Sequence, residues 1–395
     1  MTARIPLALV TLCAASLVLA GVPSAAAAGP STHVATGSTI GGDNLLAVGP
    51  VVHKLAGAQP LPVVKATAWV LADLTTGEIL AAHNAHMRLR PASTLKTLTS
   101  LTLLNFLDPK LQYKVLAIDT RADGSKVGVV ANAKYTVNDL LHGLLLPSGN
   151  DAASSLAHAY GGFQRTVTAM NAEAVQLQAL DTHAVNPSGL DADAQFSSAY
   201  DLALIARAAL GVPVFRSITG TKSYAFPGKP AAAGAKRSTY RIYSQNRLLL
   251  HGFKGTFAGK TGFTTKAGRT FWAAATRNGH SLVVTLMQIG ESSETAAKAL
   301  LTWGFRNESH VAPVGQLVDP VPPASANATT TRTNSLSAVN ASPPSAFDQI
   351  SGENGMPLAL SLLAASVVGI AMLCRRRRPK EPTSEQPSAV TTIGE

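Results

Sequence analysis

The order of apolar patterns between Val63 and Asn307 constrains the fold of this chain more than any other feature. Two apolar runs around the turn-like "DLTTG", in "TAWVLADLTTGEILAAH", predict a β-hairpin near the start of this region. Apolar residues at helical spacing fill its middle, in "VNDLLHGLLL", "NDAASSLAHAY", "FQRTVTAMNAEAVQLQAL" and "AYDLALIARAAL". The strand patterns "FAGKTGFT", "RTFWAAAT" and "SLVVTLMQIG" then precede a last helix in "SETAAKALLTWGF". Strands at both ends with helices between them predict a mixed α/β fold, with one sheet and an inserted helical lobe.

The segments before and after this region have a different composition. Arg4, an apolar stretch and the small residues of "PSAAAAG" predict a secretory signal peptide over residues 1–28. Small residues, Gly and Pro over residues 29–62 predict a flexible leader before a compact domain at 63–310. Residues 311–356 include "PVPPASANATTTRTNSLSAVNASPPS", which has too few apolar residues to fold, so a disordered stalk is expected there.

An uncharged apolar run, Pro357–Cys374, follows the expected stalk and is about as long as the minimum for crossing a bilayer. The basic "RRRRPK" comes next, and the positive-inside rule places residues 375–395 in the cytoplasm. We therefore expect a single-pass protein of the cell membrane, anchored by residues 357–374, with its compact domain outside the cytoplasm. A buried core helix is the alternative for this run, and it fits poorly with the four arginines that follow. Both cysteines, Cys13 and Cys374, fall in the membrane-directed segments, so no disulfide is expected in the compact domain.

The formal net charge of +11 invites a nucleic-acid interpretation. Only 14% of the residues are charged, however, and the densest basic run is the one beside the apolar C-terminal segment. No basic stripe interleaved with aromatic residues is found, so no nucleic-acid partner is expected. Diffuse positive charge could instead favour an anionic envelope.

Three short motifs occur in order along the compact region. Ser93 and Lys96 form S-x-x-K in "PASTLKT", and residues three apart share a helix face. Ser148 and Asn150 form S-x-N in "LLPSGNDAAS", at a loop leading into a helix, and Lys260–Gly262 form K-T-G on an expected strand. The ordered trio is far more specific than any one motif, and it is typical of serine acyl-enzymes that bind penicillin.

Each motif by itself has a simpler explanation. Ser93 could lie beside a solvated lysine by chance, and Ser148 and Asn150 could cap a helix, because S-G-N-D is good capping chemistry. Lys260–Gly262 could be a strand that ends in a turn.

Two further features favour structural roles. His83 and His86 in "HNAHMR" have a spacing that could hold a metal ion, but no third ligand is near in sequence, so a loop role is expected and no metal. The segment "NPSGLD", Asn186–Asp191, is interpreted as a turn that supports a cleft.

The chain resembles the D-alanyl-D-alanine carboxypeptidases, which are low-molecular-mass penicillin-binding proteins. The segments "PASTLKTLT", "LLLPSGNDAASSLA", "MNAEAVQL", "NPSGLDADAQFSSAYDLALIA", "GKTGFTTKAGRTFWAAA" and "LLTWGF" resemble that family's blocks in the family's order, over Ala66–Phe305. The resemblance implies an antiparallel sheet flanked by helices with an all-helical lobe, the transpeptidase fold of penicillin-binding proteins and β-lactamases. The Ala-rich composition, the stalk and the C-terminal anchor resemble actinobacterial proteins.

The resemblance also implies roles for the motif residues. Ser93 would attack the penultimate D-Ala carbonyl of a peptidoglycan stem peptide ending in D-Ala-D-Ala and release the last D-Ala. Lys96 would be the general base, and it can be neutral because burial and the charge of Lys260 both lower the pKa of its amine. Ser148 would relay protons, and Asn150 would hold the substrate amide.

The remaining implied residues bind the substrate. Lys260 and Thr261 would meet the terminal carboxylate or that of a β-lactam inhibitor, and Gly262 would allow close approach. The backbone N–H groups of Ser93 and Phe263 would form the oxyanion hole. Water completes the turnover, so no cofactor is expected.

Two other functions stay open at this point. A class A β-lactamase shares the motifs but needs a glutamate in E-x-x-L-N, and Glu173, the only glutamate between S-x-N and K-T-G, lacks that context. A membrane-tethered sensor with an inactive peptidase fold is the other alternative, and endopeptidase action is a closer variant. The segment "MQIGESSETAAK" also lacks an arginine that the family often has there, and Arg269 is a candidate substitute.

Overall fold

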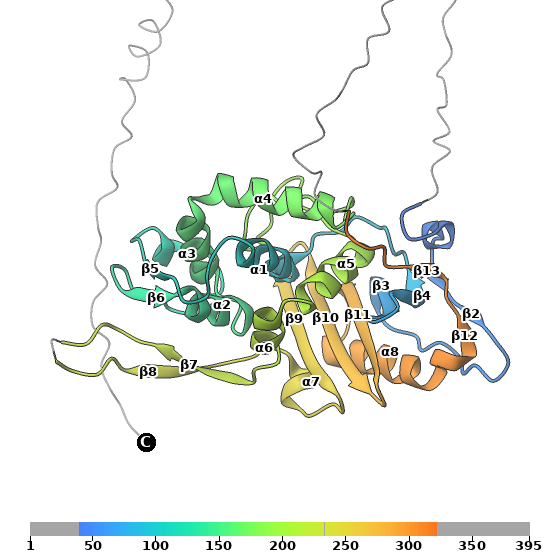
Figure 1. Ribbon diagram of the computed structural model, residues 1–395. Helices are drawn as coiled ribbons and strands as arrows, with labels where there is room; N and C mark the ends of the chain where they lie inside the picture. The colour runs from blue at the N-terminus through green and yellow to red at the C-terminus, as the bar shows by residue number, and fades with distance from the viewer. Residues whose placement is uncertain (1–38, 233, 322–395) are drawn as a thin grey trace, which may run out of the picture. The chain divides into compact units, whose positions relative to one another are not determined.

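The computed structural model describes residues 39–232 and 234–321, and an antiparallel sheet forms their centre. Its strand order is β1-β4-β3-β11-β10-β9, and β13 also pairs with β4. The strands are β1 (Pro50–Val51), β3 (Ala66–Asp73), β4 (Glu78–His83), β9 (Thr256–Thr264), β10 (Gly268–Arg277), β11 (His280–Ile289) and β13 (Gly315–Gln316). Strands from both ends of the compact region meet where β3 pairs with β11, which confirms the predicted sheet (Figure 1).

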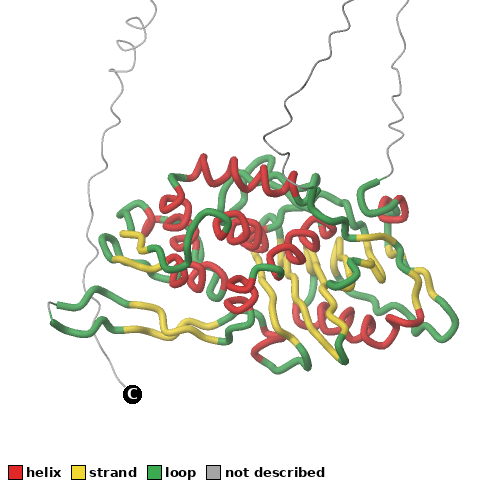
Figure 2. The backbone as a smooth tube through the Cα atoms, viewed as in Figure 1, coloured by secondary structure: helices red, strands yellow, loops and turns green. Residues whose placement is uncertain are grey.

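Helices cover both faces of this sheet and form a separate lobe beside it (Figure 2). They are α1 (Lys96–Leu104), α2 (Val137–Leu145), α3 (Asn150–Tyr160), α4 (Phe163–Gln176), α5 (Ala199–Leu210), α6 (Pro213–Thr219), α7 (Arg247–Leu250) and α8 (Ser293–Asn307). Helices α2, α3 and α4 make up the lobe, and α8 lies on the sheet face opposite α5 (Figure 1). The mixed α/β fold with an inserted all-helical lobe is therefore confirmed.

The central strands are apolar along their whole length because both of their faces are buried. On β11, Val284 and Leu286 pack in the core under α8, whereas Val283 and Met287 pack in the core on the α5 side. Alternate residues of a strand point to opposite faces, so a strand covered on both sides needs a nearly continuous apolar run. This explains why "SLVVTLM" shows no polar alternation.

Two hairpins of the described chain were not predicted from the sequence. Strands β5 (Gln112–Lys114) and β6 (Lys134–Thr136) pair within the lobe. Strands β7 (Ser223–Pro227) and β8 (Thr239–Tyr243) pair in an arm that extends away from the sheet (Figure 1). Their patterns are short and mostly exposed, with burial only at single positions such as Phe226 and Ile242, so the period-two signal is weak.

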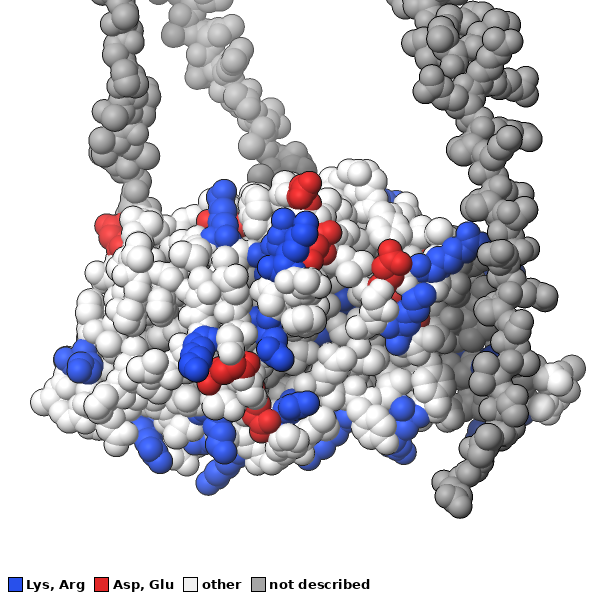
Figure 3. Space-filling view, turned by 180° about the vertical axis from the view of Figure 1, so that it is seen from behind, with Lys and Arg blue, Asp and Glu red and all other residues white. Residues whose placement is uncertain are grey.

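Charged side chains are dispersed over the surface. On the face displayed in Figure 3, Lys and Arg are separated by uncharged residues and several lie beside Asp or Glu. This face carries the diffuse positive charge that the composition indicates.

The leader expected over residues 29–62 is corrected from Thr39 onward, because this part folds against the compact domain. A 3₁₀ turn, η1 (Asp43–Leu46), buries Leu45 in the main core at 2% exposure. Strand β1 then pairs with β4, with Pro50 opposite His83. The small residues that suggested flexibility instead form tight turns, as Gly41 does at φ +85°.

The start of the expected stalk at residue 311 is also corrected. Strand β12 (Val311–Ala312) pairs with β2 (His53–Lys54), and β13 adds to the main sheet. The side chains of Val314 and Leu317 are buried at 1% exposure, so this stretch has enough apolar contact to fold despite its prolines.

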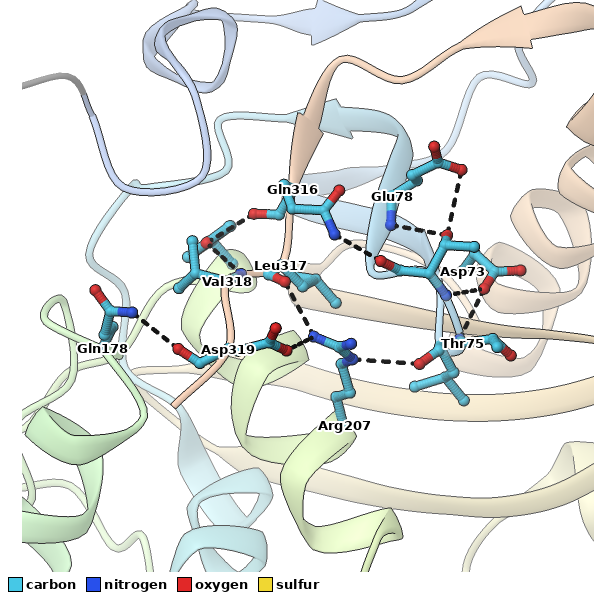
Figure 4. A network of polar contacts seen from close by, with 12 residues as sticks. Asp73, Thr75, Glu78, Gln178, Arg207, Gln316, Leu317, Val318 and Asp319 are labelled. Carbon is cyan, nitrogen blue, oxygen red and sulfur yellow. Dashed lines mark hydrogen bonds and ion pairs between the residues drawn. The ribbon is translucent and has the colours of Figure 1, made fainter. Parts of the chain in front are cut away.

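Polar contacts hold residues 316–319 against α5 and the β3–β4 turn (Figure 4). Arg207 on α5 donates to the carbonyl oxygen of Leu317 at 3.0 Å and pairs with Asp319 Oδ1 at 3.1 Å. Gln316 Nε2 donates to the carbonyl oxygen of Thr76 at 2.6 Å. The compact domain thus spans the described range instead of 63–310.

The remaining predictions on organisation lie outside the described residues. These are the signal peptide (1–28), the leader before residue 39, the stalk beyond 321, the membrane helix (357–374) and the basic tail (375–395). Within 39–232 and 234–321, no single helix is long and apolar enough to cross a membrane, and one bent pair, α5 with α6, meets the criteria of length and composition alone.

Candidate active site

Ser93 lies in a 3₁₀ turn, η2 (Ala92–Leu95), directly before α1. The regular α-helix begins three residues after Ser93, at Lys96. The carbonyl oxygen of Pro91 accepts hydrogen bonds from Thr94 Oγ1 at 2.6 Å and from Thr270 Oγ1 of β10 at 2.8 Å, which fixes the turn to the sheet. Ala92 adopts φ +49°, an uncommon conformation for a residue with a side chain. The turn presents a partly exposed Ser93 hydroxyl to a cleft.

Lys96 is fully buried one helical turn after Ser93, and its Nζ atom lies 2.9 Å from Ser93 Oγ. Nζ also donates to Asn150 Oδ1 at 2.7 Å and to the carbonyl oxygen of Ser188 at 2.5 Å. A neutral amine has two N–H groups and one lone pair. Because two carbonyl acceptors take the N–H groups, the lone pair of a neutral Lys96 faces the Ser93 hydroxyl.

The surroundings of Lys96 favour this neutral form. Burial lowers the pKa of Lys96 well below its ordinary value, and the nearby charge of Lys260 lowers it further, while Asp151 acts in the opposite direction. Desolvation dominates because the side chain has no contact with bulk water. The Lys96 amine is therefore buried, and Lys260 lies near enough to affect its pKa.

Ser148 and Lys260 form a second pair in the same site. Lys260 is 1% exposed, and its Nζ atom donates to Ser148 Oγ at 3.0 Å and to the carbonyl oxygen of Thr261 at 2.6 Å. Burial lowers the pKa of Lys260 to about 7. Ser148 adopts φ +67°, and the N-cap of α3 is Gly149 without any side-chain cap. The helix-capping alternative for Ser148 and Asn150 is therefore wrong.

Two hydrogen bonds within the protein position the Asn150 side chain. Its Oδ1 atom accepts from Lys96, and its Nδ2 atom donates to the carbonyl oxygen of Asp123 at 2.6 Å. The residue is only 5% exposed. Asn150 therefore orients the Lys96 amine, and its contact with a substrate amide stays a prediction.

The K-T-G residues lie inside β9, which continues to Thr264, so the alternative of a strand ending in a turn is wrong. A Cβ atom on Gly262 would lie 2.3 Å from Thr270 Oγ1 and 2.8 Å from the backbone nitrogen of Ser93. Only a glycine allows β9 to approach the Ser93 turn this closely. Phe263 follows with its side chain 65% exposed at the cleft.

The turn at Asn186–Asp191 supports the site as interpreted, and it also contributes a contact that sequence motifs missed. Asn186 Oδ1 accepts from the backbone N–H groups of Ser188 and Gly189, which closes the turn. Gly189 has φ +79°, and a Cβ atom there would lie 2.0 Å from the carbonyl oxygen of Ala92. The turn thereby holds the Ser188 carbonyl group against Lys96. A backbone acceptor carries no side-chain signal that could have revealed it.

Gln245 is a second residue that the motifs missed. Its Oε1 atom accepts from Thr261 Oγ1 at 3.1 Å, and its Nε2 atom donates to the carbonyl oxygen of Pro147 at 3.1 Å. Gln245 thus links the K-T-G strand to the loop that carries Ser148. In the sequence, the only signal for this role is the position of Gln245 just before α7.

A cleft of about 830 Å³ unites these parts and is lined by Ser93, Ser148, Gln245, Thr261, Gly262 and Phe263, among others. This volume is in the range of small-molecule sites. Glu173, which a β-lactamase interpretation would have to use, lies on α4 and accepts from Asn105 Nδ2 at 3.1 Å. It is not among the residues lining the cleft.

The two histidines of "HNAHMR" have structural contacts. His86 Nδ1 lies 2.8 Å from Asp181 Oδ2, and its other ring nitrogen lies 3.1 Å from the carbonyl oxygen of Ile40. His83 ends β4 and contacts Trp69 edge-on. Within the described ranges, no three His, Cys, Asp or Glu side chains gather as metal ligands would.

The antiparallel sheet, the helical lobe and the Ser–Lys pair at their junction define the class of the penicillin-binding-protein or DD-transpeptidase fold. The chain is similar to the crystal structure of the Streptomyces K15 DD-transpeptidase, with a TM-score of 0.59 and 27% identity, over 63% of this chain and 100% of that one. The chain belongs to the D-alanyl-D-alanine carboxypeptidase family, peptidase family S11, whose model matches residues 55–290.

Two curated relatives place the chain within this family. It is 41% identical over 257 residues to the D-alanyl-D-alanine carboxypeptidase DacB2 of Mycobacterium tuberculosis, which covers 63% of this chain and 86% of that protein. It is 35% identical over 266 residues to the D-alanyl-D-alanine carboxypeptidase DacD of Escherichia coli K12, and spans slightly less than two thirds of that protein, 65%. The expected actinobacterial character is consistent with the mycobacterial relative.

Proposed function

We propose that this protein is a serine-type D-alanyl-D-alanine carboxypeptidase that removes the terminal D-Ala from peptidoglycan stem pentapeptides through an acyl-enzyme. The observation that carries the proposal is the Lys96 amine, whose N–H groups face Asn150 Oδ1 and the Ser188 carbonyl while its lone pair faces Ser93 Oγ. A serine hydroxyl becomes a nucleophile when a neutral base lies within hydrogen-bond reach. Membership of the carboxypeptidase family supports the substrate class.

Acylation begins when Ser93 Oγ attacks the carbonyl carbon of the penultimate D-Ala, and its proton passes to Lys96 Nζ. The negative charge on the substrate oxygen is stabilised by the backbone N–H groups of Ser93 and Phe263. The C–N bond then breaks, and Ser148, whose hydroxyl contacts Lys260 at 3.0 Å, relays the proton held by Lys96 to the departing amine of the last D-Ala, so that Lys96 is neutral again. The products are the ester of Ser93 and free D-Ala.

Deacylation reverses these proton transfers with water in place of the amine. Lys96 takes a proton from water, the hydroxide attacks the ester, and Ser93 leaves with a proton. Strand β9 is at the end of the sheet order, so its free edge can pair with an extended peptide. This favours a peptide substrate bound alongside the K-T-G residues.

Penicillins would acylate Ser93 and leave slowly, because Glu173, the only glutamate between the S-x-N and K-T-G motifs, is not placed to activate a hydrolytic water. Glu173 is bound to Asn105 and does not line the cleft. We therefore favour inhibition over β-lactamase activity. Rapid, repeated hydrolysis of penicillin by the purified protein would contradict this assignment.

The protein acts outside the cytoplasm in this proposal, held by one C-terminal membrane helix at residues 357–374. The uncharged Pro357–Cys374 run and the arginines after it support this topology. A chain truncated after residue 356 should appear in the soluble fraction, whereas the full chain should sediment with membranes. Equal partitioning of the two chains would refute the anchor.

The central experiment measures D-Ala release from a diacyl-L-Lys-D-Ala-D-Ala peptide and, separately, labelling by fluorescent penicillin. We expect Ser93→Ala and Lys96→Ala to lower D-Ala release by roughly 10³-fold or more and to lose labelling. Lys266→Ala is the matched control, since this exposed lysine does not line the cleft.

Unchanged release by Lys96→Ala would refute the assigned base. Labelling of the wild type at Ser93 without any D-Ala release would favour the sensor alternative.

A further inference from the structure

The positive charge of this chain is concentrated in one segment. No Asp or Glu occurs between Asp201 and Glu291, whereas residues 202–290 contain 13 of the 33 Lys and Arg. The rest of the chain therefore has 20 Lys and Arg against all 22 Asp and Glu, so this segment accounts for more than the whole formal net charge of +11. A surface built from this segment stays positive, because no carboxylate of its own neutralises its cations.

The exposed part of this segment forms one edge of the molecule. The end of α6 packs against the start of β9, since a Cβ atom on Gly220 would lie 2.7 Å from the carbonyl oxygen of Phe257. The β7–β8 arm begins beside α6, where the Lys222 carbonyl oxygen accepts from the backbone N–H of Ser244 at 2.9 Å. The arm, α6, α7 and the adjoining ends of β9 and β10 lie along the lower edge in Figure 1. Along the lower edge of Figure 3, Lys and Arg outnumber Asp and Glu.

Five cations of this surface are unpaired, and we define them as the basic edge: Arg216, Lys222, Arg241, Lys254 and Arg277. Arg277 is half-buried, and the other four are exposed. Among the described residues, none of the five is in an ion pair, and of the 13 cations in residues 202–290 only Arg207 has one, with Asp319. The charge of the basic edge is thus available to a partner outside the domain.

Two arginines of the basic edge are held in place by aromatic rings. The Arg216 guanidinium lies 4.6 Å from the centre of the Phe257 ring. The Arg277 guanidinium lies 4.5 Å from the centre of the Phe253 ring and 4.7 Å from that of Phe305. Stacking through the flat face leaves the N–H groups at the rim of a guanidinium free for an anion. It also fixes the side chain before binding, which lowers the entropic cost of association.

The members of the basic edge do not converge on one point. They lie on α6 and β8, directly before β7, near the start of β9 and at the end of β10, and none lines the catalytic cleft. A small anion binds where several donors meet, whereas a row of separate cations suits a polymer with a negative charge at each repeat.

The apolar surface beside the basic edge is small. The exposed large apolar side chains in this region are Tyr240, Tyr243 and Leu250, and the hydroxyl of Tyr240 is bound to the Val127 carbonyl oxygen. A stable protein interface has an apolar core, and a membrane-surface helix inserts an apolar face. The basic edge therefore fits a hydrophilic, charged partner better than either of these.

We propose that the basic edge binds a linear polyanion, a polymer that carries a phosphate or carboxylate group at each repeat. Binding proceeds by release of counterions from the polymer, so the affinity falls as salt is added. A polymer bound there leaves the catalytic cleft open, because the five cations lie outside its lining. The basic edge would thus hold the enzyme on an anionic polymer of the envelope while the cleft takes its peptide.

The test measures binding of the full chain, in neutral detergent, to long-chain inorganic polyphosphate over a range of salt concentrations. The edge variant combines Arg216→Gln, Lys222→Gln, Arg241→Gln and Lys254→Gln. The control variant combines Lys54→Gln, Lys110→Gln, Lys114→Gln and Lys298→Gln, which replace exposed lysines outside residues 202–290 and remove the same net charge.

We expect the edge variant to bind polyphosphate about 100-fold more weakly at low salt, with the slope of log K against log salt smaller by about 3. The control variant should stay within about 3-fold of the wild type. The double variant Lys222→Gln with Lys254→Gln disturbs no aromatic stacking, and it should lose about 10-fold. All three variants should unfold at the urea concentration of the wild type.

Equal weakening by the edge and control variants would show a response to net charge alone and overturn the proposal. Wild-type binding of tripolyphosphate as tight as that of polyphosphate would overturn the linear partner. Phosphatidylglycerol in the micelles is the membrane probe, and displacement of polyphosphate by it at equal phosphate concentration would overturn the polymer in favour of a membrane surface. Failure of D-Ala release would refute the proposed function and leave this binding test unaffected.

Discussion

Replacing Lys260 by methionine separates what this amine contributes to the chemistry from its effect on stability. Methionine is similar in length, carries no charge and fits an apolar environment, and the Lys260 side chain is only 1% exposed. The substitution removes the hydrogen bonds from Nζ to Ser148 Oγ and to the Thr261 carbonyl. It also removes the charge that lowers the pKa of Lys96.

The expected change in the free energy of unfolding follows from the pKa of Lys260, which burial lowers from 10.5 to about 7. Each pKa unit corresponds to about 1.4 kcal/mol, so the buried amine lowers the free energy of unfolding by roughly 5 kcal/mol below pH 7. The native state binds fewer protons than the unfolded chain between pH 7 and 10.5, so this free energy rises with pH across that window. The two hydrogen bonds that the variant loses each offset about 1 kcal/mol of the gain from removing the buried amine. We expect Lys260→Met to be more stable by about 3 kcal/mol at pH 7.

The assay is urea unfolding of the wild type and Lys260→Met at pH 6.5, 8 and 10, with penicillin labelling measured in parallel. The stability gain should be largest at pH 6.5 and should become a loss of about 1 kcal/mol by pH 10, while labelling is lost at every pH. Lys266→Met, which replaces an exposed lysine, should change the free energy of unfolding by no more than about 0.5 kcal/mol. Its penicillin labelling should equal that of the wild type. A variant that is less stable at pH 6.5, or a gain that does not fall with pH, would refute the lowered pKa of the buried Lys260 amine.

Two further substitutions test buried contacts, one beside the Ser93 turn and one against α3. Gly189→Ala should lower the free energy of unfolding by about 3 kcal/mol and slow penicillin labelling, because its Cβ atom would lie 2.0 Å from the Ala92 carbonyl oxygen. Gly279→Ala, at φ +86° with open space around it, should lose only about 1 kcal/mol in the same urea titration, and equal losses would contradict the close contact. Asp119→Ala should lower the free energy of unfolding by about 3–5 kcal/mol, since the fully buried carboxylate accepts from His158 Nδ1 at 2.6 Å. A loss below about 1 kcal/mol in thermal or urea unfolding would show that this pair is not needed for stability.

Local sequence patterns predicted most of the fold where burial is regular. The helices of the lobe and the strands β3, β4, β9, β10 and β11 were predicted because their apolar periodicity reflects the face that each one buries. The ends of the domain were predicted less well. Gly, Pro and small residues at 39–62 and 311–321 indicated flexibility, yet single buried anchors such as Leu45 and Leu317, with strand pairing, hold these segments in place. A single buried apolar residue in a polar stretch produces no apolar periodicity from which an element could be predicted.

The sequence by itself determined which side chains are available for chemistry. S-x-x-K, S-x-N and K-T-G are local patterns, and the spacing of three residues places Lys96 beside Ser93 across the turn that leads into α1. Tertiary structure alone decided the protonation state of the Lys96 amine. The Ser188 carbonyl and Asn150 Oδ1 take its N–H groups from positions 92 and 54 residues away, and Lys260 lowers its pKa from β9. Protonation depends on desolvation and on charges brought together in space, and neither is a property of any short stretch of chain.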